Sequence, residues 1–196
     1  MRAPWPSLLA CAAIALAPGT AGAGAQQYEV LSASVRASLA QAVGGREPAR
    51  LDDAESRAWV SAMHARVMER MRDERHAREF LELVRYEARR AGLEPQLVLA
   101  VIDVESGFRK YAVSTAGARG YMQVMPFWIK VIGREDDNLF HMRTNLRYGC
   151  VILRHYLDIE RGNLHNALAR YNGSLGRPEY PDRVLRALRS RWTPGA

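Results

Sequence analysis

The chain has 196 residues, of which 48% are hydrophobic and 25% charged, the composition of an ordinary globular protein with one core. Its formal net charge of +7 suits an anionic partner such as the polymers of a cell envelope. Nucleic acid is excluded as the expected partner, because lysine is scarce, the arginines are dispersed and no nucleic-acid-binding motif occurs.

Residues 1–25 have the layout of a secretory signal. Arg2 precedes an apolar run over residues 8–17, and overlapping Ala-x-Ala sites end at Ala23 and Ala25. Because the run is too short to span a bilayer, we predict a signal peptide cleaved near Ala25 and a mature protein in the periplasm. The mature chain keeps 27 of the 28 basic residues and all 21 acidic ones, a balance of +6.

The two cysteines predict neither an anchor nor a disulfide. Cys11 lies in LLAC, a weak lipoprotein-like site preceded by few residues and followed by more of the apolar run, so lipid anchoring is the less favoured alternative. If Cys11 leaves with the signal, Cys150 has no partner and is expected to be a buried apolar residue. The histidines lack the close pairing of zinc sites, so we expect no metal and no cofactor.

The predicted elements are all helices. Residues 26–50 give a weak signal, with apolar residues at every fourth position from 31 to 43, and the order of this lead segment stays open. Stronger helical patterns cover residues 53–71, 74–91, 94–107, 144–160, 164–171 and 182–192. Residues 108–126 form a loop that re-enters helix at about Tyr121. No strand pattern competes, so we expect an all-α fold with short connections.

Glu105 lies on the apolar stripe of the helix over residues 94–107. The stripe consists of Val98, Val101, Ile102 and Glu105, at the i, i+3, i+4 and i+7 spacing. Burial and the nearby negative end of the helix dipole both disfavour a carboxylate here and raise its pKa, which suits a general acid. The alternative is a glutamate that bends into solvent or pairs with Arg109. Asp103 lies about 200° around the helix from Glu105 and is expected to face solvent.

Three motifs follow in order: ESGF at 105–108, STAGARGYMQVMP at 114–126 and ALARYNG at 167–173. Together they resemble the signatures of the soluble lytic transglycosylase catalytic domain, a lysozyme-like helical fold, over about residues 91–188. The resemblance implies an enzyme that cleaves the peptidoglycan bond between N-acetylmuramic acid and N-acetylglucosamine without water, leaving 1,6-anhydromuramoyl ends.

The resemblance also assigns roles to single residues. Glu105 matches the only catalytic carboxylate of the family, which acts first as acid and then as base, and Ser106 matches a structural partner beside it. The expected substrate-binding residues are Ser114, Gln123, Met125, Tyr171 and Asn172, with the Tyr171 hydroxyl orienting the catalytic carboxyl. From the residues alone, Met125 and Tyr171 would be read as core side chains.

Two departures from the family pattern concern the cleft. Tyr121 replaces the usual leucine, and its hydroxyl needs a partner if it is buried. After Asn172 the chain reads GSLGRPEYP where the family commonly has Ala-Gly-Pro, so the floor of the cleft there is expected to differ.

A single carboxyl group can serve this reaction if the substrate supplies the second group. Most glycosidases use two carboxyl groups, but N-acetyl sugars can attack their own anomeric carbon through the acetamido oxygen. The family mechanism implied by the resemblance works in this way. Glu135, Asp136 and Asp158 are possible second carboxylates, because the sequence does not exclude their approach to Glu105 in the fold.

We therefore predict a lytic transglycosylase domain over residues 91–192, with a helical lead segment over 26–90 that packs on it. Two alternatives are a hydrolytic muramidase on the same fold and a noncatalytic peptidoglycan-binding or assembly protein. Peptidoglycan glycan strands are the expected partner, with cell-envelope assembly complexes as a further possibility and a monomer as the expected state.

Overall fold

The computed structural model describes residues 26–45 and 53–193. The predicted signal peptide, its cleavage site and Cys11 lie outside these residues. The described chain forms α1 (Ala33–Gly44), α2 (Ala54–Met68), α3 (Glu74–Arg90), α4 (Pro95–Glu105), α5 (Phe127–Ile132), α6 (Met142–Ile159), α7 (Leu164–Asn172), α8 (Glu179–Ala187) and a π-helical turn, η1 (Leu188–Trp192). Extended pairing in these residues is limited to two isolated bridges, which join Arg119 to Val113 and to Val124. The expectation of an all-α fold is confirmed.

Local signals set most helix boundaries. The side chains of Ser32, Asp53, Asp73 and Asn163 each accept a hydrogen bond from a backbone N–H three residues later, which caps α1, α2, α3 and α7. Helix α4 starts at Pro95, where a missing N–H costs nothing. Gly107 follows its end with a φ of 57°, a conformation that glycine adopts without strain.

Two sequence-based boundaries were wrong. The chain does not re-enter helix at Tyr121, because residues 120–123 form a turn in which Gln123 has a φ of 49°. The next helix, α5, starts only after Pro126. The last predicted helix begins three residues earlier than expected, at Glu179, and its regular part ends at Ala187. The weak lead segment does contain a helix, α1.

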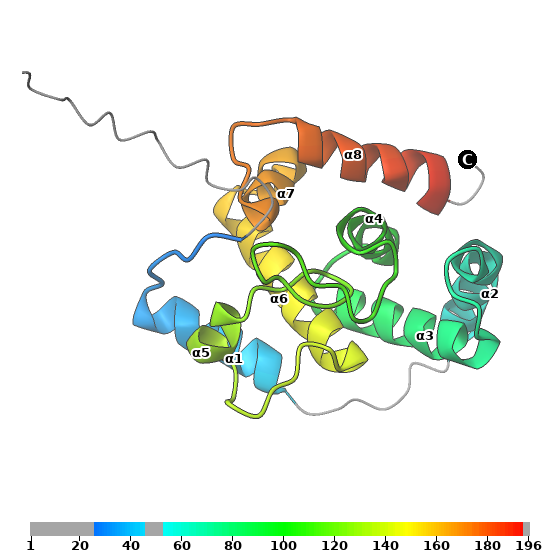
Figure 1. Cartoon of the computed structure of the whole chain (residues 1–196), viewed down its shortest axis with the longest axis horizontal. Coiled ribbons are helices and arrows are strands. Elements are labelled where there is room, and N and C mark those ends of the chain that lie inside the picture. Colours follow the sequence, from blue (N-terminus) through cyan, green and yellow to red (C-terminus); the bar gives the residue numbers. More distant parts are fainter. Residues whose placement is uncertain (1–25, 46–52, 194–196) are drawn as a thin grey trace, which may run out of the picture.

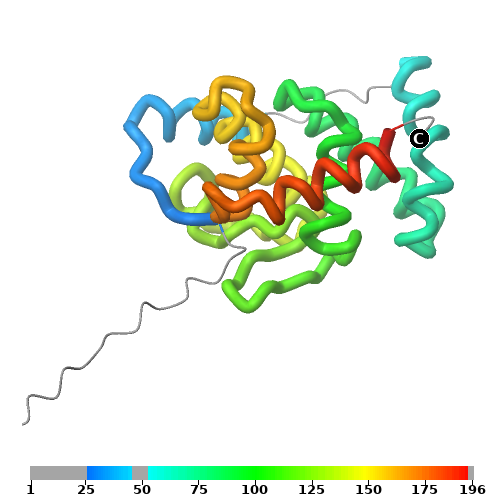
Figure 2. Tube along the Cα trace, turned by 90° about the horizontal axis from the view of Figure 1, so that it is seen from above, coloured from blue at the N-terminus to red at the C-terminus, as the bar shows by residue number. Residues whose placement is uncertain are grey.

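Helix α4 lies at the centre of the packing. It contacts α3 on one side and α8 with η1 on the other, and residues 97–102 of α4 are all buried. Helix α6 joins the two sides by packing on both α3 and α7 (Figure 1). Viewed from above, α8 crosses the molecule to reach the side where α2 lies (Figure 2). The end of α4 that carries Glu105 is thereby held between helices from distant parts of the sequence.

The turn at residues 120–123 is seated directly on α6. Asn145 accepts a hydrogen bond from the Met122 N–H (2.8 Å) and donates to the carbonyls of Arg119 (2.8 Å) and Leu139 (2.9 Å). Gly149, one turn further along α6, touches Met122 so closely that an added Cβ would lie 2.4 Å from the Met122 Sδ. These contacts therefore fix the position of the turn relative to α6.

The N-terminal helices contact several other elements. Helix α1 contacts α5 and α6, while α2 contacts α3 and η1. In the described part of the chain, no helix combines the length and the apolar character needed to cross a bilayer.

Candidate active site

Glu105 is the last residue of α4, and its carboxyl group is held by other elements. The Tyr180 hydroxyl of α8 donates a 2.6 Å hydrogen bond to Glu105 Oε1. Burial raises the pKa of Glu105 to about 7, although hydrogen bonds from Tyr180 and Asn172 and the charge of Arg183 act in the opposite direction. Glu105 stays partly exposed, so a ligand can reach it. A carboxyl group with this pKa can give up or accept a proton near neutral pH.

The alternative pairing of Glu105 with Arg109 does not occur. The Arg109 Nε donates to the Ser106 carbonyl at 2.8 Å instead. Ser106 is buried, and its hydroxyl donates to the Ile102 carbonyl at 3.2 Å, which closes the last turn of α4. The role of Ser106 as a structural partner of Glu105 stays a prediction.

The Tyr171 hydroxyl does not hydrogen-bond Glu105, although this was its expected role. Its hydroxyl donates to the Met122 carbonyl at 2.7 Å, and the residue is 1% exposed. The hydroxyl bound to Glu105 is that of Tyr180, which the sequence analysis did not single out. One signal was available: Tyr180, Val184 and Ala187 share one buried helical face, but the predicted helix began only at residue 182.

Asn172 and Ser114 make different contacts. Asn172 ends α7, is 8% exposed and lies close enough to Glu105 for its side chain to lower the pKa of that carboxyl group. Ser114 lies in the 108–126 loop, where its hydroxyl accepts the Ala118 N–H at 3.0 Å. The Ser114 hydroxyl proton is not used in that bond and can be donated.

Gln123 and Met125 both lie in the 108–126 loop. The Gln123 Nε2 donates to the carbonyls of Gly120 (2.9 Å) and Ala112 (3.2 Å), so its amide nitrogen braces the loop. Its carbonyl oxygen is left to accept other hydrogen bonds. Met125 is partly exposed and packs against the core with its apolar side chain.

Asp103 does not face solvent, contrary to the sequence-based expectation. Its side chain is 4% exposed and accepts from Arg191 Nη1 at 2.8 Å and from the Trp192 Nε1 at 3.3 Å. Arg70, in the turn after α2, lies 3.5 Å from its other oxygen. These partners come from η1 and from the turn that follows α2. Asp103 thus links both to α4, two residues before Glu105.

The remaining acids that could have served as a second carboxylate lie elsewhere. Asp136 is 78% exposed and pairs with Arg134, and Asp158 pairs with Arg154 one turn earlier on α6. Glu135 is exposed. Among the described residues, no group of histidine, cysteine, aspartate and glutamate side chains is suited to hold a metal ion.

Tyr121 has the partner that its burial requires. Its hydroxyl lies 3.1 Å from His76 Nε2 of α3, and its ring packs against Phe80 with the centroids 4.9 Å apart. Burial raises the pKa of Tyr121 to about 12, so the hydroxyl keeps its proton. The replacement of leucine at this position is therefore accommodated by a residue outside the matching motifs.

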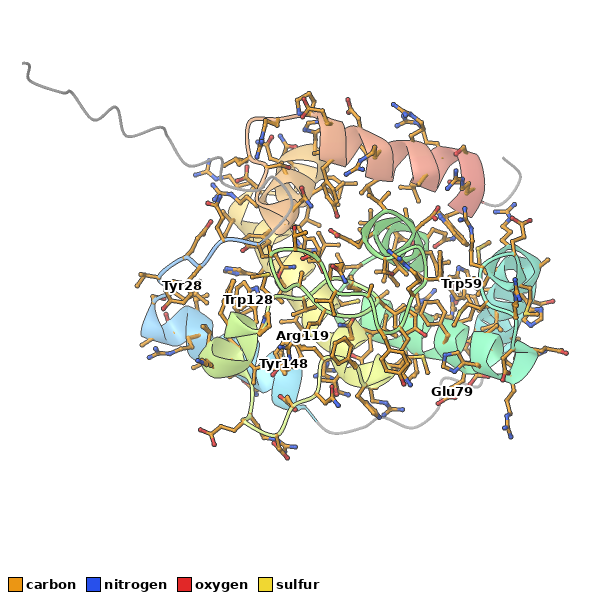
Figure 3. All side chains as sticks on the ribbon, in the orientation of Figure 1. Tyr28, Trp59, Glu79, Arg119, Trp128 and Tyr148 are labelled. Atoms are coloured by element: carbon orange, nitrogen blue, oxygen red, sulfur yellow. The ribbon has the colours of Figure 1, made fainter. Side chains whose placement is uncertain are left out.

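The first described residues reach the same loop. Gln26 is 5% exposed, and its side-chain oxygen accepts the Met125 N–H at 3.1 Å. Glu29 pairs with Arg170 of α7 at 3.2 Å. Tyr28 packs edge-on against Phe127, at the end of the molecule where Figure 3 also labels Trp128. This segment touches both the 108–126 loop region and α7, which together flank Glu105.

Comparison with known proteins gives concordant matches. The family described as Transglycosylase SLT domain matches residues 82–182. Membrane-bound lytic murein transglycosylase C of Actinobacillus pleuropneumoniae is 56% identical over 50 residues, which are 26% of this chain and 14% of that protein. The protein of the same name from Yersinia pestis is 33% identical over 119 residues, 53% of this chain and 33% of that protein.

A solved structure of an inactive mutant of the lytic transglycosylase Slt from Pseudomonas aeruginosa also matches, with 26% identity and a TM-score of 0.44. The match covers 54% of this chain and 20% of that one. The chain thus spans a third or less of the length of the curated relatives named above. The family match includes Glu105, Tyr180 and the three sequence motifs and extends over more than half of the chain, which belongs to the Transglycosylase SLT domain family.

Proposed function

We propose that the protein is a peptidoglycan lytic transglycosylase that cleaves the N-acetylmuramic acid to N-acetylglucosamine bond and leaves 1,6-anhydromuramoyl ends. The observation that carries the proposal is Glu105. It is a partly exposed carboxyl group with a pKa of about 7, hydrogen-bonded by Tyr180 and close to Asn172, within a chain of the Transglycosylase SLT domain family. The names of the relatives support the same chemistry.

The proposed reaction uses Glu105 twice. Protonated Glu105 gives its proton to the glycosidic oxygen while the bond from that oxygen to the muramyl anomeric carbon breaks. The acetamido oxygen of the same sugar bonds to the anomeric carbon and forms an oxazolinium ion. The Glu105 carboxylate then takes the proton of the muramyl 6-hydroxyl, whose oxygen displaces the acetamido oxygen. The ring closes, and Glu105 is protonated again.

The neighbours of Glu105 are assigned complementary roles. Tyr180 and Asn172 position the carboxyl group, and both side chains favour its charged form after the first proton transfer. Ser114, the Gln123 carbonyl oxygen and the Met125 thioether line the cleft that binds the sugars. We assign Tyr171 a supporting role, since its hydroxyl holds the Met122 carbonyl and so the turn that bears Gln123.

The product distinguishes this reaction from the hydrolytic alternative. We expect purified protein acting on cell-wall sacculi to release muropeptides that end in anhydromuramic acid, each lighter by one water than the reducing-end product of a muramidase. Mass spectrometry of the released fragments measures this difference. Reducing ends alone would establish a muramidase, and the absence of any release would support a noncatalytic role.

Changing Tyr180 to phenylalanine should move the pH profile. The Tyr180 hydroxyl favours the Glu105 carboxylate, so its loss raises the pKa of Glu105 further above 7. The first step needs protonated Glu105, and we expect the alkaline limb of kcat/KM to shift to higher pH. Because the base in the second step is then poorly oriented, kcat at the optimum should fall by about tenfold. The profile of each protein is measured on soluble glycan strands between pH 5 and 9.

A matched control is Tyr111 to phenylalanine, since Tyr111 is 70% exposed on the loop. We expect this variant to keep the wild-type pH profile. An unshifted profile in the Tyr180 variant would contradict the role assigned to its hydroxyl.

For the whole chain we propose a catalytic domain over residues 91–192 and a lead segment over 26–90 that packs on it. The contacts of α1 with α5 and α6 support this division, although the family match already begins within α3 at residue 82. The names of the relatives support an envelope location. Export through the signal at residues 1–25, a periplasmic location, a monomeric state and association with envelope assembly complexes remain parts of the proposal.

A further inference from the structure

Three arginines follow Tyr180 at intervals of three residues: Arg183, Arg186 and Arg189. All three are exposed. Arg183 lies with its guanidinium 5.9 Å from the centre of the Tyr180 ring. Among the described residues, no acidic side chain lies within ion-pair distance of Arg186 or Arg189. We call these three residues the α8 arginine row.

The row starts beside the catalytic carboxyl group and leads away from it. The interval of three residues from Arg183 to Arg186 turns an α-helix by about 300°, so Arg186 is displaced by about 60° around α8 from Arg183. Tyr180 touches Glu105, and the charge of Arg183 acts on Glu105. Arg189 lies further along the chain, in η1, which directly follows α8. The positive charges therefore extend from the cleft to the solvent-facing side of α8.

Nearby charges leave the row available. Of the two acids in the first turn of α8, Asp182 pairs with His165 at 3.3 Å. Two cations of the 108–126 loop lie over aromatic rings, Lys110 over Tyr111 at 5.2 Å and Arg119 over Phe140 at 5.8 Å, and the third, Arg109, donates to the Ser106 carbonyl. Among the described residues, the side chains of Arg186 and Arg189 have neither an aromatic nor an acidic partner.

We propose that the α8 arginine row binds the carboxylates of the peptide stems that project from the glycan strand held in the cleft. The inference rests on the proposed function, because it assumes that a glycan lies at Glu105. Each muramyl residue bears a short peptide with free carboxylates, and these extend away from the sugar backbone. A guanidinium pairs with a carboxylate through two parallel hydrogen bonds, which makes arginine well suited to this contact.

The test compares three substrates prepared from the same sacculi: glycan with intact stems, glycan with the stem carboxylates capped as amides, and glycan freed of stems by an amidase. The variant is Arg186→Gln with Arg189→Gln, which spares Arg183 because of its closeness to Glu105. The matched control is Arg36→Gln with Arg72→Gln, which removes two exposed charges outside α8. The rate at which anhydro ends are released is measured for each protein with each substrate.

We expect the wild-type protein to cleave stem-bearing glycan faster than stem-free glycan. In the α8 variant the ratio of these rates should fall by about threefold, and the control should keep the wild-type ratio. Capping the carboxylates, or raising the ionic strength, should lower the ratio for the wild-type protein and have little effect on that of the α8 variant.

Three results would overturn the inference. The first is a wild-type ratio in the α8 variant, and the second is an equal response of both proteins to capping. The third is a loss of binding to phosphatidylglycerol vesicles in the α8 variant with an unchanged ratio, which would assign the row to a membrane surface. If the wild-type protein releases no anhydro ends from any substrate, the proposed function itself fails, an outcome distinct from an active enzyme with an unaltered ratio.

Discussion

Glu105→Gln abolishes the release of anhydro ends while the protein stays folded. This is the result that we expect, because glutamine can neither protonate the glycosidic oxygen nor accept the proton of the 6-hydroxyl. Positioned acid or base catalysis contributes about 10² to 10⁴ in rate, and one residue supplies both steps here, so the loss should be on the order of 10⁴ or more. Turnover on sacculi is measured by mass spectrometry. Glu82→Gln, at an exposed position of α3, is the matched control and should stay active.

The same variant should be more stable than the wild-type protein at alkaline pH. The folded state raises the pKa of Glu105 from 4.5 to about 7 and so binds the proton more tightly than the unfolded chain. The stabilisation linked to this proton is complete below pH 4.5 and is lost as the pH rises through 7. Glutamine carries no charge to be desolvated, so Glu105→Gln avoids this loss.

We expect the thermal midpoint of Glu105→Gln to match that of the wild-type protein near pH 4.5 and to exceed it at pH 8.5. The gain should be on the order of 1–2 kcal/mol, since the partial exposure of Glu105 reduces the cost of its charge. Calorimetry at the two pH values measures it. Equal midpoints at pH 8.5, or an active variant, would contradict the assignment of Glu105 as a desolvated acid.

The second large effect is expected at Asp103, where alanine should destabilise the whole fold. The Asp103 side chain is 4% exposed and accepts from Arg191 and Trp192 of η1, while Arg70, in the turn after α2, lies 3.5 Å away. Its removal leaves the buried Trp192 Nε1 without an acceptor and releases two cations that are themselves partly exposed and can turn to water. We expect a loss of about 2 kcal/mol in the free energy of unfolding.

For a chain of this size the change corresponds to a fall of roughly 4–8 °C in Tm, measurable by calorimetry. Asp136→Ala removes an acid whose partner Arg134 is equally exposed and should alter stability by less than about 0.5 kcal/mol. If Asp103→Ala behaved like this control, the contacts of Asp103 with η1 would contribute nothing measurable to the free energy of unfolding.

The sequence predicted those parts of the site that depend on local signals. Pro95 and Gly107 bracket α4, and the apolar spacing places Glu105 on the inner face, so the position and raised pKa of this residue followed from a single segment. The all-α class followed from the same periodicity in the other segments. The motif around Gln123 indicated the loop that flanks Glu105.

The parts that the sequence did not predict depend on contacts between distant segments. Tyr180 reaches Glu105 across 75 positions, and Arg191 reaches Asp103 across 88. Helical geometry predicted the side of α4 on which Asp103 lies, but not that η1 packs against that side. The chain around Gln123 was expected to be helical. Its left-handed backbone is imposed instead by the pairing of Arg119 with Val124 and by the hydrogen bonds of Asn145, which the local sequence does not reveal.

Gly149 limits how the stability of this protein can be increased. Replacing a glycine inside a helix with alanine is a common route to higher thermostability, because alanine restricts the unfolded chain. Here the added methyl group would collide with Met122 and lift the turn that bears Gln123 off α6. In a combinatorial library, this position would be depleted of every residue except glycine, and directed evolution toward robustness would have to begin elsewhere.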